Sequence, residues 1–95
     1  MRCFQMLNIV LSNRFKKDLK TISKRNYDLD LLDEVVNTLA AQKPLPAKNK
    51  DHPLTGDYVG FRECHVQPDW LLVYRVEDDD LILFLSRTGT HSDLF

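Results

Sequence analysis

The hydrophobic period of the chain changes once, around Pro44 and Pro46, and this change limits the folds that the chain can adopt. Before the prolines, apolar residues recur every three or four positions, which is the spacing of amphipathic helices. After them come short runs with strand patterns, of which residues 61–66 alternate between two faces. The 95 residues have room for one hydrophobic core. The sequence therefore predicts a single α+β domain, residues 1–95, in which a helix pair covers one face of a sheet.

The first half of the chain predicts one strand and a helical hairpin. Residues 6–11 (MLNIVL) are branched and apolar, and they end at Ser12, which can cap a helix. The apolar residues that follow have the spacing of one helix face, and they are Phe15, Leu19 and Ile22. After Asp28, a second candidate cap, residues 29–40 carry a continuous apolar stripe. Because few residues separate the two helices, we expect them to pack antiparallel.

The second half predicts strands joined by turns. Residues 47–58 are interpreted as a loop, and residues 61–66, 71–76 and 81–88 have strand patterns. The acidic run at residues 77–80 is interpreted as a solvated hairpin tip, because it lacks the glycine and ligand spacing of a calcium loop. Together with the N-terminal strand, these segments predict a four-stranded, mainly antiparallel sheet.

Charge is distributed unevenly along the chain. The net charge is −1, but residues 14–50 hold nine Lys or Arg against five Asp or Glu, whereas residues 51–95 hold three against nine. Proteins that bind nucleic acid usually carry a basic excess. Only the helical half offers one, which counts against a simple electrostatic RNA binder.

The chain has the features of a cytosolic protein. No apolar run is long enough for a membrane span, and the N-terminus is interpreted as a strand and not as a signal peptide. The two cysteines, Cys3 and Cys64, lack metal-ligand spacing, so we expect reduced thiols.

The titratable and stacking residues gather in two stretches, residues 50–70 and 87–95. The histidines there are His52, His65 and His91. With Asp69 they offer zinc ligands, but no short pair of histidines would hold two ligands on one element. Cys64 and His65 cannot form a nucleophilic dyad, because neighbours on a strand point to opposite faces. Taken alone, Asp69 and Trp70 also fit a capping aspartate and a core tryptophan.

A third chemistry is RNA cleavage without a metal. It needs a base for the 2′-hydroxyl, an acid for the leaving 5′-oxygen and a cation on the phosphate. Histidine suits proton transfer near neutral pH, and arginine suits the phosphate. Aromatic rings can stack on unpaired bases. The two stretches contain every one of these residue types.

The motifs DHPL, GFRE, CHV-x-PDW and RTGTH occur here in that order, between Asp51 and Phe95. In motif and element order the chain resembles the YafQ branch of the RelE/ParE superfamily, the toxins of bacterial type II toxin–antitoxin systems. The resemblance implies a RelE-like fold, similar to that of small microbial ribonucleases. It also implies a ribosome-dependent endoribonuclease that cleaves mRNA in the bacterial cytoplasm by 2′-hydroxyl attack, with no cofactor and no metal.

The resemblance also assigns roles to individual residues. Its catalytic set is His52, His65, Asp69, Arg87 and His91. On this interpretation His65 or His91 handles protons, Asp69 acts as a further base or orients a histidine, and Arg87 stabilises charge on the phosphate. His52 assists at the phosphate or in proton transfer. The residues expected to contact RNA are Lys50, Trp70 and Phe95.

Two alternatives remain open from the sequence. One is a non-catalytic toxin of the same fold that inhibits DNA gyrase, which would need no acid–base histidines. The other is an inactive homologue that only binds antitoxin. The expected partners are a cognate antitoxin, the ribosome and mRNA, with a monomeric free toxin that forms a hetero-oligomer with antitoxin. An acidic, partly disordered antitoxin segment is expected to cover the basic side of the helical hairpin at Lys16, Lys17, Lys20 and Lys24.

Overall fold

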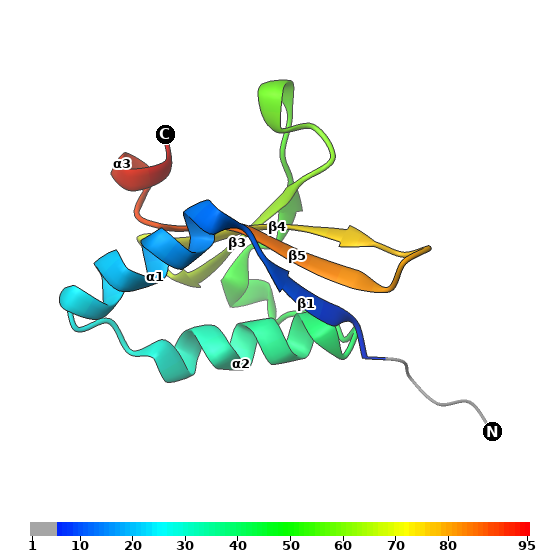
Figure 1. Ribbon diagram of the computed structural model, residues 1–95, viewed down its shortest axis with the longest axis horizontal. Helices are drawn as coiled ribbons and strands as arrows, with labels where there is room; N and C mark the ends of the chain where they lie inside the picture. The colour runs from blue at the N-terminus through cyan, green and yellow to red at the C-terminus, as the bar shows by residue number, and fades with distance from the viewer. Residues whose placement is uncertain (1–5) are drawn as a thin grey trace.

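A helical hairpin covers one face of a mixed sheet in the computed structural model, which describes residues 6–95 (Figure 1). In spatial order the strands are β1 (Asn8–Leu11), β5 (Ile82–Gly89), β4 (Trp70–Glu77), β3 (Arg62–Gln67) and β2 (His52–Pro53). Strand β1 runs parallel to β5, and the other neighbouring pairs are antiparallel. The helices are α1 (Asn13–Lys24), α2 (Leu29–Ala40) and α3 (His91–Leu94), with 3-10 turns η1 (Ala47–Asn49) and η2 (Gly56–Tyr58).

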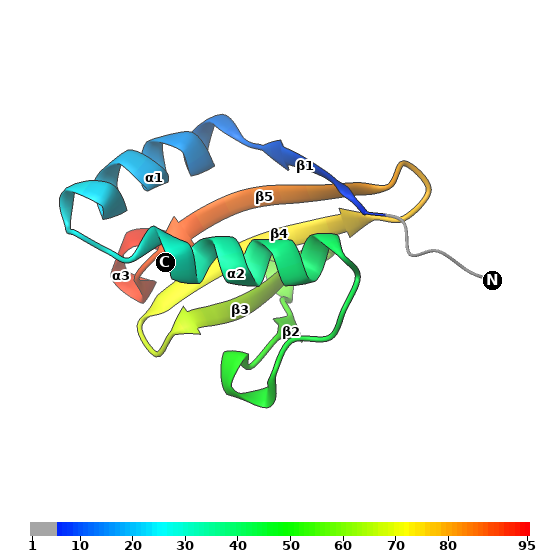
Figure 2. The ribbon, with the colours of Figure 1, turned by 90° about the horizontal axis from the view of Figure 1, so that it is seen from below.

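The two predicted helix caps are confirmed. The Ser12 hydroxyl accepts a hydrogen bond of 2.9 Å from the Phe15 amide, and the Asp28 carboxylate accepts one of 3.0 Å from the Asp30 amide. Each such cap contributes about 1 kcal/mol to helix stability. The caps fix where α1 and α2 begin. In Figure 2, α2 lies in front of the sheet and α1 lies beside β5.

The main core lies between the helical hairpin and the sheet. Its largest fully buried side chains include Phe15 and Ile22 from α1 and Trp70 and Tyr74 from β4. A smaller cluster lies on the opposite face of the sheet, and it contains Leu71, Val73 and Leu94 with the partly buried Leu54 and Phe61. In Figure 1, α3 and η2 lie on this second side, away from α2. Because burial of a large apolar side chain contributes roughly 1.5–3 kcal/mol, most of the stability comes from the helix-covered face.

The fold differs in three details from the elements expected from the sequence. The sheet has five strands and not four, because residues 52–53, expected in a loop, pair with β3 as the short strand β2. The first strand begins at Asn8 and not at Met6. The C-terminal tail is the one-turn helix α3, since its cap depends on side chains that periodicity does not report.

An irregularity in β5 decides which way its last residues point. Val73 pairs with Arg87, but the next residue, Tyr74, pairs with Leu85, so Ser86 is an extra residue in β5. A bulge of one residue reverses the alternation of side chains beyond it. Arg87 therefore lies opposite Val73, on the face of α3, and without the bulge it would point into the helix-covered core. The Ser12 hydroxyl donates to the Ser86 carbonyl at 2.7 Å and so ties α1 to the bulge.

Candidate active site

Strand register brings the predicted catalytic residues to one face of the sheet. His52 pairs with Glu63, Glu63 with Val73, and Val73 with Arg87, so these residues form one row across β2 to β5. Side chains directly opposite each other in a sheet share a face. His65 lies two residues beyond Glu63 on β3 and so shares that face.

His65 and His91 form the centre of this site. Their ring centroids are 6.4 Å apart, although the residues come from β3 and α3. The His65 Nδ1 lies 3.1 Å from the Pro68 carbonyl, which can only accept, so Nδ1 donates and Nε2 of the neutral ring carries the lone pair. The His91 Nδ1 lies 4.0 Å from the Asp69 Oδ1, and both side chains are largely exposed. This pair of rings can therefore act on a group placed between them.

The short helix α3 holds His91 through a network around Asp93. The Thr90 hydroxyl accepts from the Asp93 amide at 3.2 Å, and the Asp93 carboxylate accepts from the Thr90 amide at 2.9 Å. Arg25 of α1 donates two bonds to the same carboxylate, at 2.7 and 3.1 Å. Arg25 and Thr90 hold the pKa of Asp93 well below its usual range. Asp93 thus connects α3 to α1.

The glycine of the RTGTH motif is required by the same network. Gly89 has φ +152°, and a Cβ at this position would lie 2.9 Å from Oδ2 of Asp93. A side chain here would therefore push against the carboxylate that caps α3. Each of the last three residues of the motif therefore has a structural role: Gly89 leaves space for the Asp93 carboxylate, Thr90 caps α3, and His91 is the first residue of α3.

Arg87 is held by an aspartate of α1. Its Nε and Nη2 donate to the Asp18 carboxylate at 2.8 and 3.1 Å, and the Thr88 amide donates to the same carboxylate at 3.1 Å. The side chains of Arg87 and Asp18 are only 17% and 14% exposed. The hydrogen bond to Asp18 is the largest cause of a raised pKa for Arg87. Because Nε and Nη2 donate to Asp18, Nη1 is the nitrogen that remains to donate to a phosphate.

Asp18 was missed by the sequence analysis. It is the only acidic residue of α1, whose other charged residues are basic, and that isolation was the available signal. The side chains of the predicted antitoxin-binding lysines lie on exposed residues of the same helix, and these are Lys16, Lys17, Lys20 and Lys24.

Glu63 was also missed as a member of the site. It is 5% exposed, and its carboxylate lies 3.4 Å from Nε2 of His52, an ion pair when the ring carries both protons. The His52 Nδ1 donates to the Lys50 carbonyl at 2.7 Å, and Lys50 itself is exposed. Alternation along β3 places Glu63 on the same face as His65, but burial of the Glu63 carboxylate requires the neighbouring strand β2, which periodicity does not reveal.

Comparisons with known proteins point to one family. The model of the YafQ family, described as the bacterial toxin of type II toxin–antitoxin systems, matches residues 7–95. The Escherichia coli K12 protein named mRNA interferase toxin YafQ is 43% identical over 89 residues, which cover 93% of this chain and 95% of the relative.

The chain belongs to the YafQ family of bacterial toxins.

Solved structures of relatives share the fold of this YafQ-family protein. A metal-bound toxin from Helicobacter pylori superposes with a TM-score of 0.90 at 52% identity, over 95% of this chain and 100% of the other. The YafQ structure in the Escherichia coli DinJ–YafQ toxin–antitoxin complex gives 0.85 at 42% identity, over 95% and 98%. The family resemblance and the α+β fold predicted from the motifs are therefore confirmed.

Trp70 does not have the RNA-binding role expected of it. Its ring is 1% exposed and lies in the main core, in edge contact with Tyr27 at 4.9 Å. The indole Nε1 donates to the Thr88 hydroxyl at 2.8 Å, and this hydroxyl donates to the Leu71 carbonyl at 2.8 Å. A base cannot stack on a ring with no exposed face, so the alternative of a core tryptophan holds. Phe95, by contrast, is 58% exposed, 6.2 Å from the His91 ring.

Neither a reactive cysteine nor a cluster of metal ligands accompanies the histidines in residues 6–95 of this YafQ-family protein. Burial raises the pKa of Cys64 to about 12, which leaves it an inert thiol at neutral pH, and Cys3 lies outside the described residues. Within residues 6–95, no cluster of three or more His, Cys, Asp or Glu is arranged to hold a metal. No helix in that range is long and apolar enough to cross a membrane.

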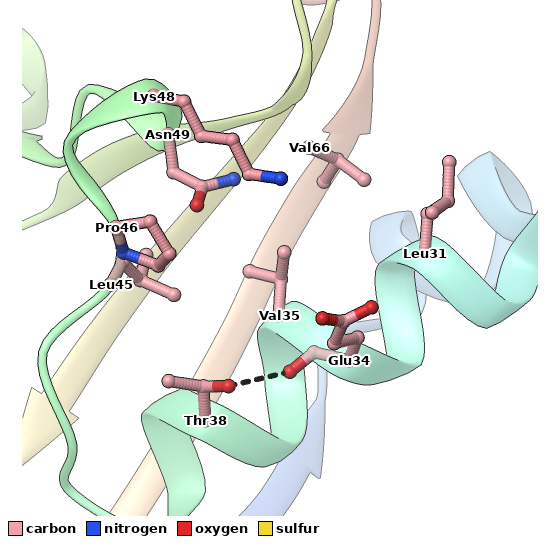
Figure 3. Close-up of a pocket in the computed structure, with 9 residues that line it drawn as sticks. All are labelled: Leu31, Glu34, Val35, Thr38, Leu45, Pro46, Lys48, Asn49 and Val66. Carbon is pink, nitrogen blue, oxygen red and sulfur yellow. Dashed lines mark hydrogen bonds between the residues drawn. The ribbon is translucent and has the colours of Figure 1, made fainter.

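A pocket between α2 and η1 contains none of the candidate catalytic residues (Figure 3). It is small, about 90 Å³, and apolar side chains such as Leu31, Val35 and Val66 line it beside Lys48 and Glu34. A neighbouring hollow of about 340 Å³ reaches His65 around the end of β3. The candidate site itself is an open sheet face with α3 beside it. Such a face suits a large substrate, whereas small molecules usually bind in enclosed pockets.

Proposed function

We propose that this YafQ-family toxin is a ribosome-dependent endoribonuclease that cleaves mRNA without a metal. The observation that carries the proposal is the placement of His65 and His91, with rings 6.4 Å apart, on the sheet face that also presents Arg87. The two rings are close enough for one to serve the 2′-hydroxyl and the other the 5′-oxygen of a single phosphodiester, as acid–base cleavage requires. The name of the Escherichia coli relative, an mRNA interferase, supports the same chemistry.

The hydrogen bonds of the histidines suggest how the two rings divide the reaction. His65 donates from Nδ1 to a backbone carbonyl, so its Nε2 is free to take the proton of the 2′-hydroxyl. The 2′-oxygen attacks phosphorus and the bond to the 5′-oxygen breaks, which yields a 2′,3′-cyclic phosphate. His91, with Asp69 facing its Nδ1, protonates the leaving 5′-oxygen.

The other polar residues would act on charge and on placement. Nη1 of Arg87 would donate to the phosphate as negative charge develops on its oxygens. His52, beside Glu63, would offer a second cation on the same face when its ring carries both protons, and the exposed Lys50, two residues before it, would add charge near the edge strand β2. Phe95 would stack on a base beside the cleaved bond.

The test is induced expression in a bacterium, followed by primer extension on a translated message. Wild type should cut within codons, and the cuts should require translation of the message. His91→Ala should abolish the cuts because the acid is lost, whereas Ser92→Ala, on the exposed neighbour in α3, should cut like wild type. Growth arrest without cuts would contradict the proposal and point to an inhibitor of DNA gyrase, and cuts that persist in His91→Ala would remove the role of His91.

Independence from a metal has a direct test. Toxin treated with EDTA and then exchanged into a magnesium buffer that supports ribosomes should cleave at the same rate as untreated toxin. A loss of cleavage that is restored by copper or zinc would contradict the metal-free mechanism. This control is pertinent because one relative is described as a metal-bound toxin.

The proposed inhibitor is an antitoxin that lies over α1. The Escherichia coli YafQ structure was solved with the antitoxin DinJ. In this chain the outer side of α1 carries four exposed lysines, which suit an acidic, partly disordered segment. We expect a monomeric free toxin in the cytoplasm and a hetero-oligomer with antitoxin.

Replacement of the four lysines by Glu should weaken antitoxin binding at least about tenfold, and unchanged affinity would refute this placement. The residues to change are Lys16, Lys17, Lys20 and Lys24.

A further inference from the structure

The segment between β2 and β3 carries an aromatic residue, Tyr58, that none of the catalytic motifs includes. The segment is closed by backbone bonds, because the Leu54 amide donates to the Phe61 carbonyl at 2.9 Å and the Phe61 amide donates to the Tyr58 carbonyl at 3.0 Å. Gly56 and Gly60 adopt φ of +66° and +93°, which side chains rarely tolerate. The backbone is therefore folded so that Tyr58 has a defined position.

Tyr58 lies against the last residue of the site. Its ring centroid is 5.5 Å from that of Phe95, with an interplanar angle of 79°. Phe95 in turn lies 6.2 Å from His91, and His91 lies 6.4 Å from His65. Four rings thus follow one another from the tip of the β2–β3 segment to the centre of the site. They come from three separate parts of the chain.

The two phenyl rings remain open to solvent. Tyr58 is 36% exposed and Phe95 is 58% exposed, so their contact with each other does not bury either ring. Within residues 6–95 the Tyr58 hydroxyl makes no hydrogen bond, although it lies near enough to Arg87 to contribute to the raised pKa of that guanidinium. Exposed aromatic rings beside a cationic face are the means by which proteins bind unpaired bases, because every base has a face that can stack.

We propose that Tyr58 is a substrate-binding residue, and that Tyr58 and Phe95 together form a platform on which an mRNA base next to the cleaved phosphate stacks. This inference rests on the proposed ribonuclease function and extends it to a residue outside the catalytic motifs. The platform fixes the base, and the histidines act on the phosphate.

The test is cleavage of a defined message on purified ribosomes, with KM and kcat measured separately. Tyr58→Leu, which keeps bulk but removes the ring, should raise KM about tenfold, in line with the loss of one stacked base, and change kcat less than about twofold. Tyr58→Phe should behave as wild type. Val59→Ala is the matched control, because Val59 is the next residue, is 74% exposed and has no ring.

The outcomes separate this inference from the proposed function. A wild-type toxin that does not cut would refute both. Cutting by wild type with an unchanged KM in Tyr58→Leu would refute only the role of Tyr58. A fall in kcat alone would show that Tyr58 acts by supporting Phe95 and His91, and would also overturn the inference. Tyr58→Gln is a second ring-free variant if the leucine variant is insoluble.

Discussion

The two faces of the sheet use similar side chains for opposite purposes. On the helix-covered face, Trp70 is enclosed and its single polar atom is bonded to Thr88. On the other face, Phe95 is exposed and lies beside an exposed histidine. Both aromatic residues were expected from the sequence to contact RNA, and only Phe95 is exposed enough to do so.

The polar groups of the two faces differ in the same way. The helix-covered face buries few of them, and the Trp70–Thr88–Leu71 chain of bonds satisfies its own donors and acceptors. The open face is organised by ion pairs, Arg87 with Asp18 and Arg25 with Asp93. Most of the buried apolar side chains therefore lie on one side and the candidate catalytic residues on the other. Helix α1 connects the two sides, because Asp18 and the C-cap residue Arg25 bond to residues of the open side.

Replacing Trp70 and Phe95 in turn should give the largest contrast between the faces. Trp70→Ala leaves a cavity in the main core and should lower the free energy of unfolding by about 3–5 kcal/mol. Phe95→Ala should change it by only about 0.5 kcal/mol, because the ring is mostly exposed. Urea denaturation measures both. Similar losses in the two variants would contradict the division of the sheet into a structural and a functional face.

Removing the charge of Asp18 should have an intermediate effect. Asp18→Asn leaves the mostly buried Arg87 with a weaker acceptor, and we expect a loss of about 1–3 kcal/mol in unfolding free energy together with slower cleavage. Asp33→Asn, at an exposed acid of α2, is the matched control and should change neither quantity. If Asp18→Asn left stability unchanged, the bond between α1 and β5 would not contribute to the position of Arg87.

Lowering the pH should have the smallest of the three effects on stability, and it should act through the ion pair that joins Asp93 of α3 to Arg25. The pKa of Asp93 is lowered in the folded protein by Arg25 and Thr90, so its stabilising contribution is fully present above its unfolded pKa, about 4. The contribution is lost as pH falls below that value toward the folded pKa. The melting temperature of wild type should therefore exceed that of Arg25→Ala at pH 6 and approach it near pH 2. A constant difference between the two proteins over this range would contradict the role of the Asp93 carboxylate.

Local sequence determined most of the secondary structure. The caps Ser12 and Asp28, the apolar spacing of the two helices and the strand patterns of residues 61–66, 71–76 and 81–88 each depend on a few neighbouring residues, so they can be read without the fold. The motifs were specific enough to predict the family. They also identified His65 and His91, which the structure brings together although 26 residues separate them in the chain.

Only the tertiary structure decided which of these residues are accessible and which are paired. Burial of Trp70 depends on Tyr27 and Thr88, and the partner of Arg87 lies 69 positions away at Asp18. The bulge at Ser86, which turns Arg87 to the open face, depends on pairing with β4. Periodicity reports the face on which a side chain lies within its own element. It cannot report what another element places against that face, because packing and ion pairing depend on the positions of distant segments.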